Sequence, residues 1–169
     1  MADHILLVGF MGVGKSTTGK LLAGRLGARY LDSDERVKER TGLTVPEIFA
    51  RRGEAAFRAE ESEVLREACA ATGPVVVGVA GGAVLDPANR ALMRTSGTVV
   101  WLRARLETIV QRVGDGRGRP LLGDDPAAAV RRLYPQREQL YAELADVVVD
   151  VDDVAAVQVA GEIAAALGR

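Results

Sequence analysis

The sequence is poor in the residues that define several classes of proteins. It has one cysteine, Cys69, among 169 residues, so it forms no internal disulfide and gives no sign of the disulfide framework of small secreted domains. It also has one histidine, His4. One histidine and one cysteine do not suffice for a zinc site of Cys and His ligands or for a Ser-His-Asp triad. We interpret His4, which precedes a predicted strand, as structural.

A charge excess and a long apolar run are also missing. Lys and Arg total 22 and Asp and Glu total 23, a net charge of -1, which disfavours a strongly basic nucleic-acid surface but leaves room for a local anion site. The longest apolar stretches, near residues 5–14 and 74–85, fall far short of the roughly 20 residues that cross a bilayer. No segment resembles a targeting signal, so we expect a cytoplasmic protein with no nucleic-acid or membrane partner.

Aromatic residues make up only 4% of the chain, although 48% of it is hydrophobic. The core must therefore consist mainly of Ala, Val, Leu and Ile. Short continuous runs of such residues are typical of strands buried on both faces of a parallel sheet, and they cover residues 5–8, 74–79, 98–102 and 146–149, with 29–32 as a weaker candidate. Helical patterns over 15–26, 54–71 and 154–167 alternate with them. This alternation and the length predict one α/β domain of the doubly wound kind over residues 1–169.

Glycine, by contrast, is abundant, and three of the nineteen glycines frame a motif at residues 9–16. Gly9-Phe10-Met11-Gly12-Val13-Gly14-Lys15-Ser16 matches G-x-x-x-x-G-K-[ST] between a predicted strand and a predicted helix. The backbone N–H groups of such a loop surround phosphate oxygens, and the helix N-terminus adds partial positive charge. Lys15 would reach the β- and γ-phosphates, and the Ser16 hydroxyl would ligate Mg²⁺.

Two acidic residues follow the strand predicted at 29–32. Asp32 closes that strand, at the end that faces the ligand crevice of a parallel sheet, where a carboxylate suits Mg²⁺. Asp34 would face the hydroxyl of an acceptor. The alternative interpretation is that Asp32-Ser33-Asp34 is only the N-cap cluster of a helix.

Three arginines have both a functional and an ordinary interpretation. Arg58 and Glu61 are neighbours on one helix surface. They form either a solvated ion pair or a pair in which Glu61 holds the guanidinium for a bidentate carboxylate. Arg119 is either a charged loop tip or an arginine finger over a triphosphate. Arg137 by itself reads more readily as a surface helix arginine.

Two segments interrupt the alternation of strands and helices. Residues 33–60 form a charged helical insertion that is too long for a simple crossover. Residues 113–120 are basic and rich in glycine, and we expect them to be mobile. A helix should then begin with Asp125 as its N-cap and Pro126 in its first turn.

Taken in order, these motifs resemble the shikimate kinase family of P-loop small-molecule kinases over essentially the whole chain. The phosphate loop alone is common to many kinases and ATPases, whereas the ordered set is specific. The set comprises Gly9–Ser16, Leu31–Asp34, Gly53-Glu54 with Phe57, Arg58 and Glu61, Gly81–Val84, Arg119–Leu122, and Arg137 with Leu140 and Tyr141.

The resemblance implies transfer of the ATP γ-phosphate to the 3-hydroxyl of shikimate, with ATP and Mg²⁺ as cofactors. Lys15, Asp34 and Arg119 would be catalytic. Shikimate would be bound by Asp34, Arg58, Gly81, Gly82 and Arg137, with Glu61 in support. The nucleotide would contact Gly12, Val13, Gly14, Lys15, Ser16, Thr17, Arg112 and Arg119, and Mg²⁺ would be held by Ser16 and Asp32.

The family likeness also implies an architecture. It is a three-layer P-loop fold with a five-stranded parallel sheet in the order 2-3-1-4-5, flanked by helices. Residues 33–60 would form the substrate-binding region and residues 112–124 a mobile lid. We expect a monomer whose partner is a small molecule.

The chain departs from the family at two places. Ala80 stands where the family usually has a first of three glycines, and alanine there costs about 1 kcal/mol if the position needs a positive φ. Residues 150–156 lack the basic residue and following proline often found beside the adenine. The alternatives are a kinase of another cyclic polyol or sugar acid, and a non-catalytic nucleotide-binding module.

Overall fold

Five parallel strands form the centre of the computed structural model, which describes residues 3–169. Their order is β2-β3-β1-β4-β5, as predicted. The bounds are β1 His4–Val8, β2 Arg29–Asp32, β3 Val75–Gly78, β4 Gly97–Arg103 and β5 Val147–Asp150. Met1 and Ala2 lie outside the described residues. They belong to the N-terminal segment in which we expected no targeting signal.

The central strand β1 pairs with a parallel neighbour on each side. Ile5 is in register with Val76 of β3 and with Thr98 of β4. All five residues of β1 are buried, which explains why this strand is a continuous apolar run instead of an alternating one. His4, also in β1, hydrogen bonds through Nε2 to the Cys69 carbonyl at 3.2 Å and lies far along the sheet from the phosphate loop, in agreement with a structural role.

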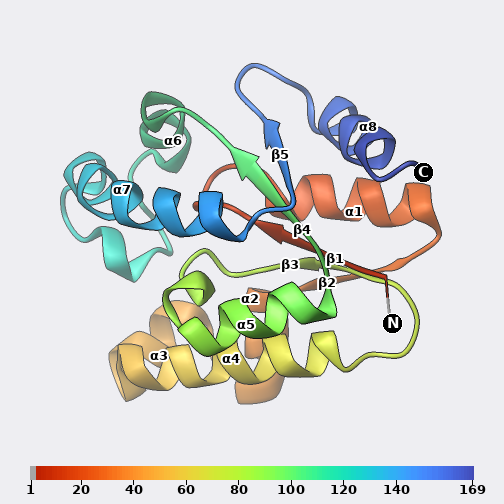
Figure 1. Cartoon of the computed structure of the whole chain (residues 1–169). Coiled ribbons are helices and arrows are strands. Elements are labelled where there is room, and N and C mark those ends of the chain that lie inside the picture. The colour runs from red at the N-terminus through yellow and green to blue at the C-terminus, as the bar shows by residue number, and fades with distance from the viewer. Residues whose placement is uncertain (1–2) are drawn as a thin grey trace.

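Helices cover both faces of the sheet (Figure 1). On one face α1, Lys15–Leu26, packs against α8, Ala156–Ala166. On the other face lie α4, Glu54–Cys69, and α5, Pro87–Ser96, with α2, Ser33–Thr41, and α3, Val45–Arg52, packed on α4. The chain is completed by α6, Leu106–Val113, α7, Pro126–Leu144, and two short 3₁₀ turns, η1 Ala83–Leu85 and η2 Pro120–Leu122.

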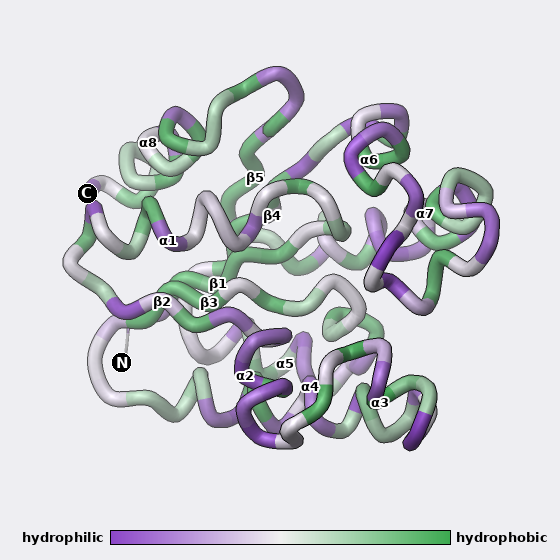
Figure 2. The backbone as a smooth tube through the Cα atoms, turned by 180° about the vertical axis from the view of Figure 1, so that it is seen from behind, coloured by the Kyte–Doolittle hydropathy of each residue, from purple (hydrophilic) through white to green (hydrophobic). Residues whose placement is uncertain are grey.

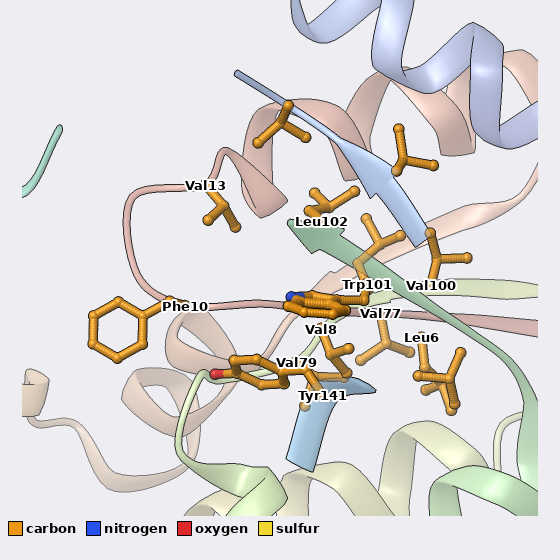
Figure 3. Close-up of a cluster of buried hydrophobic side chains, with 14 of the residues drawn as sticks. Leu6, Val8, Phe10, Val13, Val77, Val79, Val100, Trp101, Leu102 and Tyr141 are labelled. Atoms are coloured by element: carbon orange, nitrogen blue, oxygen red, sulfur yellow. The ribbon is translucent and has the colours of Figure 1, made fainter. Parts of the chain in front are cut away.

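The core consists mainly of aliphatic side chains, as the composition indicated. Figure 2 shows the strands as a hydrophobic centre, while the outer helix α2 is largely hydrophilic. Figure 3 shows one part of this core, where the Trp101 ring of β4 lies beside the Tyr141 ring of α7, with ring centroids 5.9 Å apart. In the part of the chain that the structure describes, no helix is both long and apolar enough to cross a membrane.

Most helix termini follow from local sequence signals. The N-cap of α7 is Asp125, whose side chain accepts from Ala128 N, with Pro126 in the first turn, as predicted. Thr44 and Glu47 form a capping box that starts α3. The helix predicted to end at residue 71 ends earlier, at Cys69, and the helix predicted over 154–167 spans 156–166.

Two expectations about backbone conformation have definite outcomes. Ala80 is not in the positive-φ region, where Asp153 is the one non-glycine residue of the described chain, so Ala80 causes no backbone strain. The glycines between α6 and α7 have a conformational role, because Gly114, Gly116, Gly118 and Gly123 all have positive φ angles.

A glycine pair in α1 gives a test of this packing. A Cβ at Gly19 would lie 2.3 Å from the Tyr30 ring, whereas nothing lies within 4 Å of a Cβ at the exposed Gly24. We expect Gly19→Ala to lower the free energy of unfolding by about 1–3 kcal/mol, because the ring must move. Gly24→Ala should raise it by about 0.5–1 kcal/mol through helix propensity. Urea unfolding measures both, and equal effects would contradict this account.

Candidate active site

A cavity of about 570 Å³ lies at the carboxyl edge of the sheet. Because β1, β2 and β3 are parallel, the segments that follow them meet at this edge. The cavity brings together nearly all of the residues expected to bind a nucleotide, an acceptor or a metal: Gly12, Gly14, Lys15, Ser16, Thr17, Asp32, Asp34, Arg58, Glu61, Gly81, Gly82, Arg119 and Arg137.

Two of the expected nucleotide-binding residues do not line this cavity. The Val13 side chain is buried in the core, 3% exposed, so only its backbone is available to a phosphate. Arg112 lies behind the phosphate loop, where its guanidinium donates to the Gly12 carbonyl at 3.4 Å and to the Val151 carbonyl at 3.2 Å. It borders a separate depression with Thr108, Val154 and Ala155.

The ammonium of Lys15 is held inside the phosphate loop. Nζ donates to the carbonyls of Gly9, at 2.7 Å, and Phe10, at 3.0 Å. Burial lowers its pKa to about 8, although the carboxylates of Asp34 and Asp32 act in the opposite direction. Within residues 3–169 the ammonium has carbonyl partners but forms no ion pair with a carboxylate, and bound phosphate oxygens would restore the pKa toward its ordinary value.

Asp32 caps a helix and also contacts the phosphate loop. Its Oδ1 caps α2 by accepting from Asp34 N at 3.0 Å and Glu35 N at 3.2 Å. Its Oδ2 accepts from the Ser16 hydroxyl at 2.6 Å and from the Tyr30 hydroxyl at 3.0 Å. The N-cap interpretation is thus correct, and it coexists with a contact to the phosphate loop.

The pair Ser16 and Asp32 suits a magnesium ion. Both offer the hard oxygen atoms that Mg²⁺ prefers, and the Ser16 oxygen keeps lone pairs while its proton points at Asp32. The described residues contain no group of three or more His, Cys, Asp or Glu arranged for a metal. Mg²⁺ sites draw most of their ligands from water and substrate phosphates, so two protein oxygens suffice here.

Asp34 lies in the same cavity, close to several charges. Burial and the neighbouring Asp32 carboxylate raise its pKa, while Lys15, Arg58 and Arg119 lower it. The net direction is upward. A carboxylate with a raised pKa has a stronger affinity for a proton, which is the property a general base requires.

Arg58 is half-buried and its partner Glu61 is buried, so the interpretation as a solvated ion pair is wrong. Glu61 is 2% exposed, and Arg58 Nη1 donates to both of its oxygens, at 2.9 and 3.1 Å. The guanidinium lies so close to Gly82 that any Cβ there would overlap it. Glu61 and Gly82 thereby fix the guanidinium at the cavity wall.

Arg137 is also buried, and the interpretation as a surface helix arginine is wrong. It is 3% exposed, and its guanidinium carbon lies 5.3 Å from the centre of the Phe10 ring. No ion pair to Arg137 is formed within residues 3–169. Burial lowers its pKa. A buried cation that faces a cavity without a carboxylate partner creates a site for an anion.

Arg119 reaches the cavity from the segment between α6 and α7. The residue lines the cavity with Gly118, Pro120 and Leu121, and its charge acts on both Lys15 and Asp34. The alternative of a charged loop tip directed at solvent is therefore wrong.

Sequence reasoning missed an apolar wall of the cavity. Val45 and Phe49 of α3 line it together with Phe57 of α4, and the two phenylalanine rings have centroids 5.1 Å apart. The signal was present, because Val45 and Phe49 are four residues apart on one face of a helix in a charged segment. The wall adds apolar surface to the cavity, and the Arg58 guanidinium carbon lies 5.5 Å from the centre of the Phe57 ring.

Comparison with known proteins decides the family. The sequence model of the family described as shikimate kinase matches residues 11–168. The chain belongs to the shikimate kinase family. A shikimate kinase of Thiobacillus denitrificans is 47% identical over 149 residues, which cover 88% of this chain and 81% of that protein. One of Halorhodospira halophila is 46% identical over 166 residues, 98% of this chain and 93% of that one.

A solved structure of the family agrees with the fold. The shikimate kinase from Acinetobacter baumannii in complex with shikimate superimposes with a TM-score of 0.93 and 36% sequence identity, covering 99% of this chain and 94% of that one. The P-loop fold, the sheet order and the assignment to a family of ATP-dependent kinases that use Mg²⁺ are thereby confirmed.

The low pKa of Lys15 makes nucleotide affinity depend on pH. Above pH 8 the Lys15 side chain of the free protein is mostly neutral. Because the bound phosphates favour the charged ammonium, Lys15 must take up a proton when the nucleotide binds. The affinity for a non-hydrolysable ATP analogue should therefore fall by up to about tenfold per pH unit. The phosphates themselves titrate near pH 6 and do not interfere. Calorimetry at pH 9 in two buffers of different ionisation enthalpy measures the proton uptake. Lys15→Arg, charged throughout, is the control, and a constant affinity between pH 7.5 and 9.5 would contradict the assignment.

Proposed function

We propose that this protein transfers the γ-phosphate of ATP to the 3-hydroxyl of shikimate. The observation that carries the proposal is that two arginines, the half-buried Arg58 and the buried Arg137, line the same cavity as the phosphate loop. A loop for a triphosphate and a subsite for a small carboxylate, side by side, fit a kinase whose acceptor is a hydroxy acid. The family supports this choice.

The acceptor is held by charge on one side and by shape on the other. Arg58 and Arg137 bind its carboxylate, and Glu61 keeps the Arg58 guanidinium in place. Gly81 allows the acceptor close to the backbone, Gly82 leaves room for the Arg58 guanidinium that binds it, and Asp34 faces the hydroxyl that is phosphorylated. Binding in one orientation supplies much of the rate enhancement, because it brings the hydroxyl and the γ-phosphate together.

The transfer itself depends on charge neutralisation. Lys15 and Arg119 stabilise the negative charge on the transferring phosphoryl group, and Asp34 orients the attacking hydroxyl and accepts its proton. Mg²⁺, when bound next to Ser16 and Asp32, neutralises charge on the phosphate oxygens. The phosphates are surrounded by the backbone of Gly12, Val13 and Gly14 and by the side chain of Thr17. Arg112 lies against the adenine.

The remaining assignments complete the proposal. Residues 33–60 act as the substrate-binding region and residues 112–124 as a lid that excludes water from the cavity. The chain works as one kinase domain over residues 1–169, as a monomer in the cytoplasm, with no nucleic-acid or membrane partner. An acceptor other than shikimate, namely another cyclic polyol or sugar acid, is favoured by one observation, the Ala80 methyl group on the cavity wall.

The two acceptor hypotheses separate in one assay. ADP release is followed with ATP, Mg²⁺ and either shikimate or a panel of other hydroxy acids. We expect turnover with shikimate to exceed that with every other acid. Turnover on another acid without shikimate-dependent ADP release would overturn the proposal, and Ala80→Gly would then identify whether the methyl group causes the change.

Arg58→Ala should weaken acceptor binding selectively. Loss of a charged hydrogen-bonding partner raises the KM for shikimate by roughly 10- to 100-fold and leaves the KM for ATP unchanged. Arg66→Ala is the matched control on the same helix, since Arg66 is exposed and pairs with Glu63 at 3.1 Å. Thermal unfolding checks folding, because Glu61 loses its partner. An equal loss of ATP affinity would contradict the assignment.

Arg119→Ala should act on the chemical step. Because the charge is needed most in the transition state, kcat should fall by about 10²- to 10³-fold with little change in either KM. Arg131→Ala on α7, where the Arg131 side chain is 53% exposed, 3.8 Å from Glu107 and outside the cavity lining, removes the same charge without comparable loss. An unchanged kcat in Arg119→Ala would remove its role.

A further inference from the structure

Tyr141 lies where α7 meets the segment that follows β3. Its hydroxyl donates a 2.6 Å hydrogen bond to the carbonyl of Gly81, a residue 60 positions earlier. The side chain is fully buried against Trp101 and is absent from the cavity lining. Figure 3 shows the phenol oxygen at the end of the ring that points toward the side where Phe10 lies.

The same hydroxyl lies near Arg137, one turn earlier on α7. This polar contact raises the pKa of Arg137 and lowers that of the phenol, against the effects of burial. A Cβ placed on Gly81 would lie 3.6 Å from both Arg137 Nη1 and the Tyr141 oxygen, so these three groups surround one point. A phenol has one proton and two lone pairs, so while it donates to Gly81 it keeps the lone pairs with which to accept from the nearby guanidinium.

Arg137 has few other restraints on its orientation. The centre of the Phe10 ring lies 5.3 Å from the guanidinium carbon of Arg137 and attracts the cation. This attraction does not depend on how the guanidinium is rotated about the ring axis. Neither a carboxylate nor a second hydrogen bond from a described side chain directs its N–H groups. The Tyr141 hydroxyl is the nearby side-chain acceptor that is placed to direct the guanidinium fork, on which bidentate recognition of a carboxylate depends.

We propose that Tyr141 is a positioning residue for the acceptor: its hydroxyl orients the Arg137 guanidinium and fixes the Gly81 backbone before the acceptor binds. The inference rests on the proposed function, which makes Arg137 and Gly81 parts of the acceptor subsite. Tyr141 acts through these two groups and does not touch the acceptor itself. Because the subsite is ordered in the free protein, binding loses less side-chain entropy.

Tyr134 provides a matched control. It lies on α7 seven residues before Tyr141 and is 4% exposed. Its hydroxyl donates a 2.9 Å hydrogen bond to the Ala104 carbonyl. Its ring also contacts Phe10, edge-on, with centroids 5.6 Å apart. Tyr134→Phe and Tyr141→Phe each remove one buried phenol-to-carbonyl hydrogen bond from the same helix, but only Tyr141 touches the acceptor subsite.

The test compares these variants in steady-state kinetics and in shikimate calorimetry. Tyr141→Phe should raise the KM and Kd for shikimate by about tenfold, with kcat and the KM for ATP nearly unchanged. Tyr134→Phe should lose stability to a similar extent and keep the wild-type KM. In an Arg137→Ala background, addition of Tyr141→Phe should have less than about a twofold further effect, because the two residues act as one unit.

Three results would overturn the inference. They are an unchanged shikimate KM in Tyr141→Phe, an equal rise in Tyr134→Phe, and a full tenfold effect that persists in the Arg137→Ala background. Absence of shikimate turnover in the unsubstituted protein would instead reject the proposed function, so the two failures are distinguishable.

A measurement on the unsubstituted protein makes the test independent of the folding of any variant. The side-chain NMR signals of Arg137, assigned by their absence in Arg137→Lys, should show a guanidinium whose rotation is already restricted without shikimate. A guanidinium that rotates freely in the free protein and becomes ordered only when shikimate is added would also overturn the inference.

Discussion

The burial of β1 in the middle of a parallel sheet is the constraint on which the rest of the structure depends. Apolar residues on both faces of this strand require neighbours on both sides and helices above and below. Since β2 and β3 run parallel to β1, their carboxyl ends reach the same edge. The phosphate loop after β1, the carboxylate that ends β2 and the turn after β3 therefore converge although they are distant in sequence.

Burial of charge at this edge is the second physical theme. The ammonium of Lys15 and the guanidinium of Arg137 are both withdrawn from water with carbonyl or aromatic neighbours in place of carboxylates. Their pKa values fall for that reason. A chain with a net charge of -1 thus contains a local excess of positive charge that a triphosphate and a carboxylate would relieve. The specificity of such a protein comes from where its few uncompensated cations lie, not from its overall charge.

Features with local signals were predictable from the sequence. The strand bounds were found to within one residue, α1 was found without error, and the phosphate loop was recognised with its flanking elements. Long-range packing was less accessible. The burial of Arg137 depends on Phe10, 127 positions earlier by residue number, and the burial of Glu61 depends on how α4 meets Gly82. The inward direction of the Val13 side chain and the restraint of Arg137 by Tyr141 likewise arise only when separate elements pack.

The division of work within the Asp32 carboxylate has a mechanical consequence. One oxygen holds the first turn of α2, and the other holds Ser16 at the start of α1. A single planar group therefore joins the first turn of α2 to the phosphate loop. The separation and mutual orientation of the two helix N-termini are set by the dimensions of one carboxylate, which places the two sides of the cavity relative to each other.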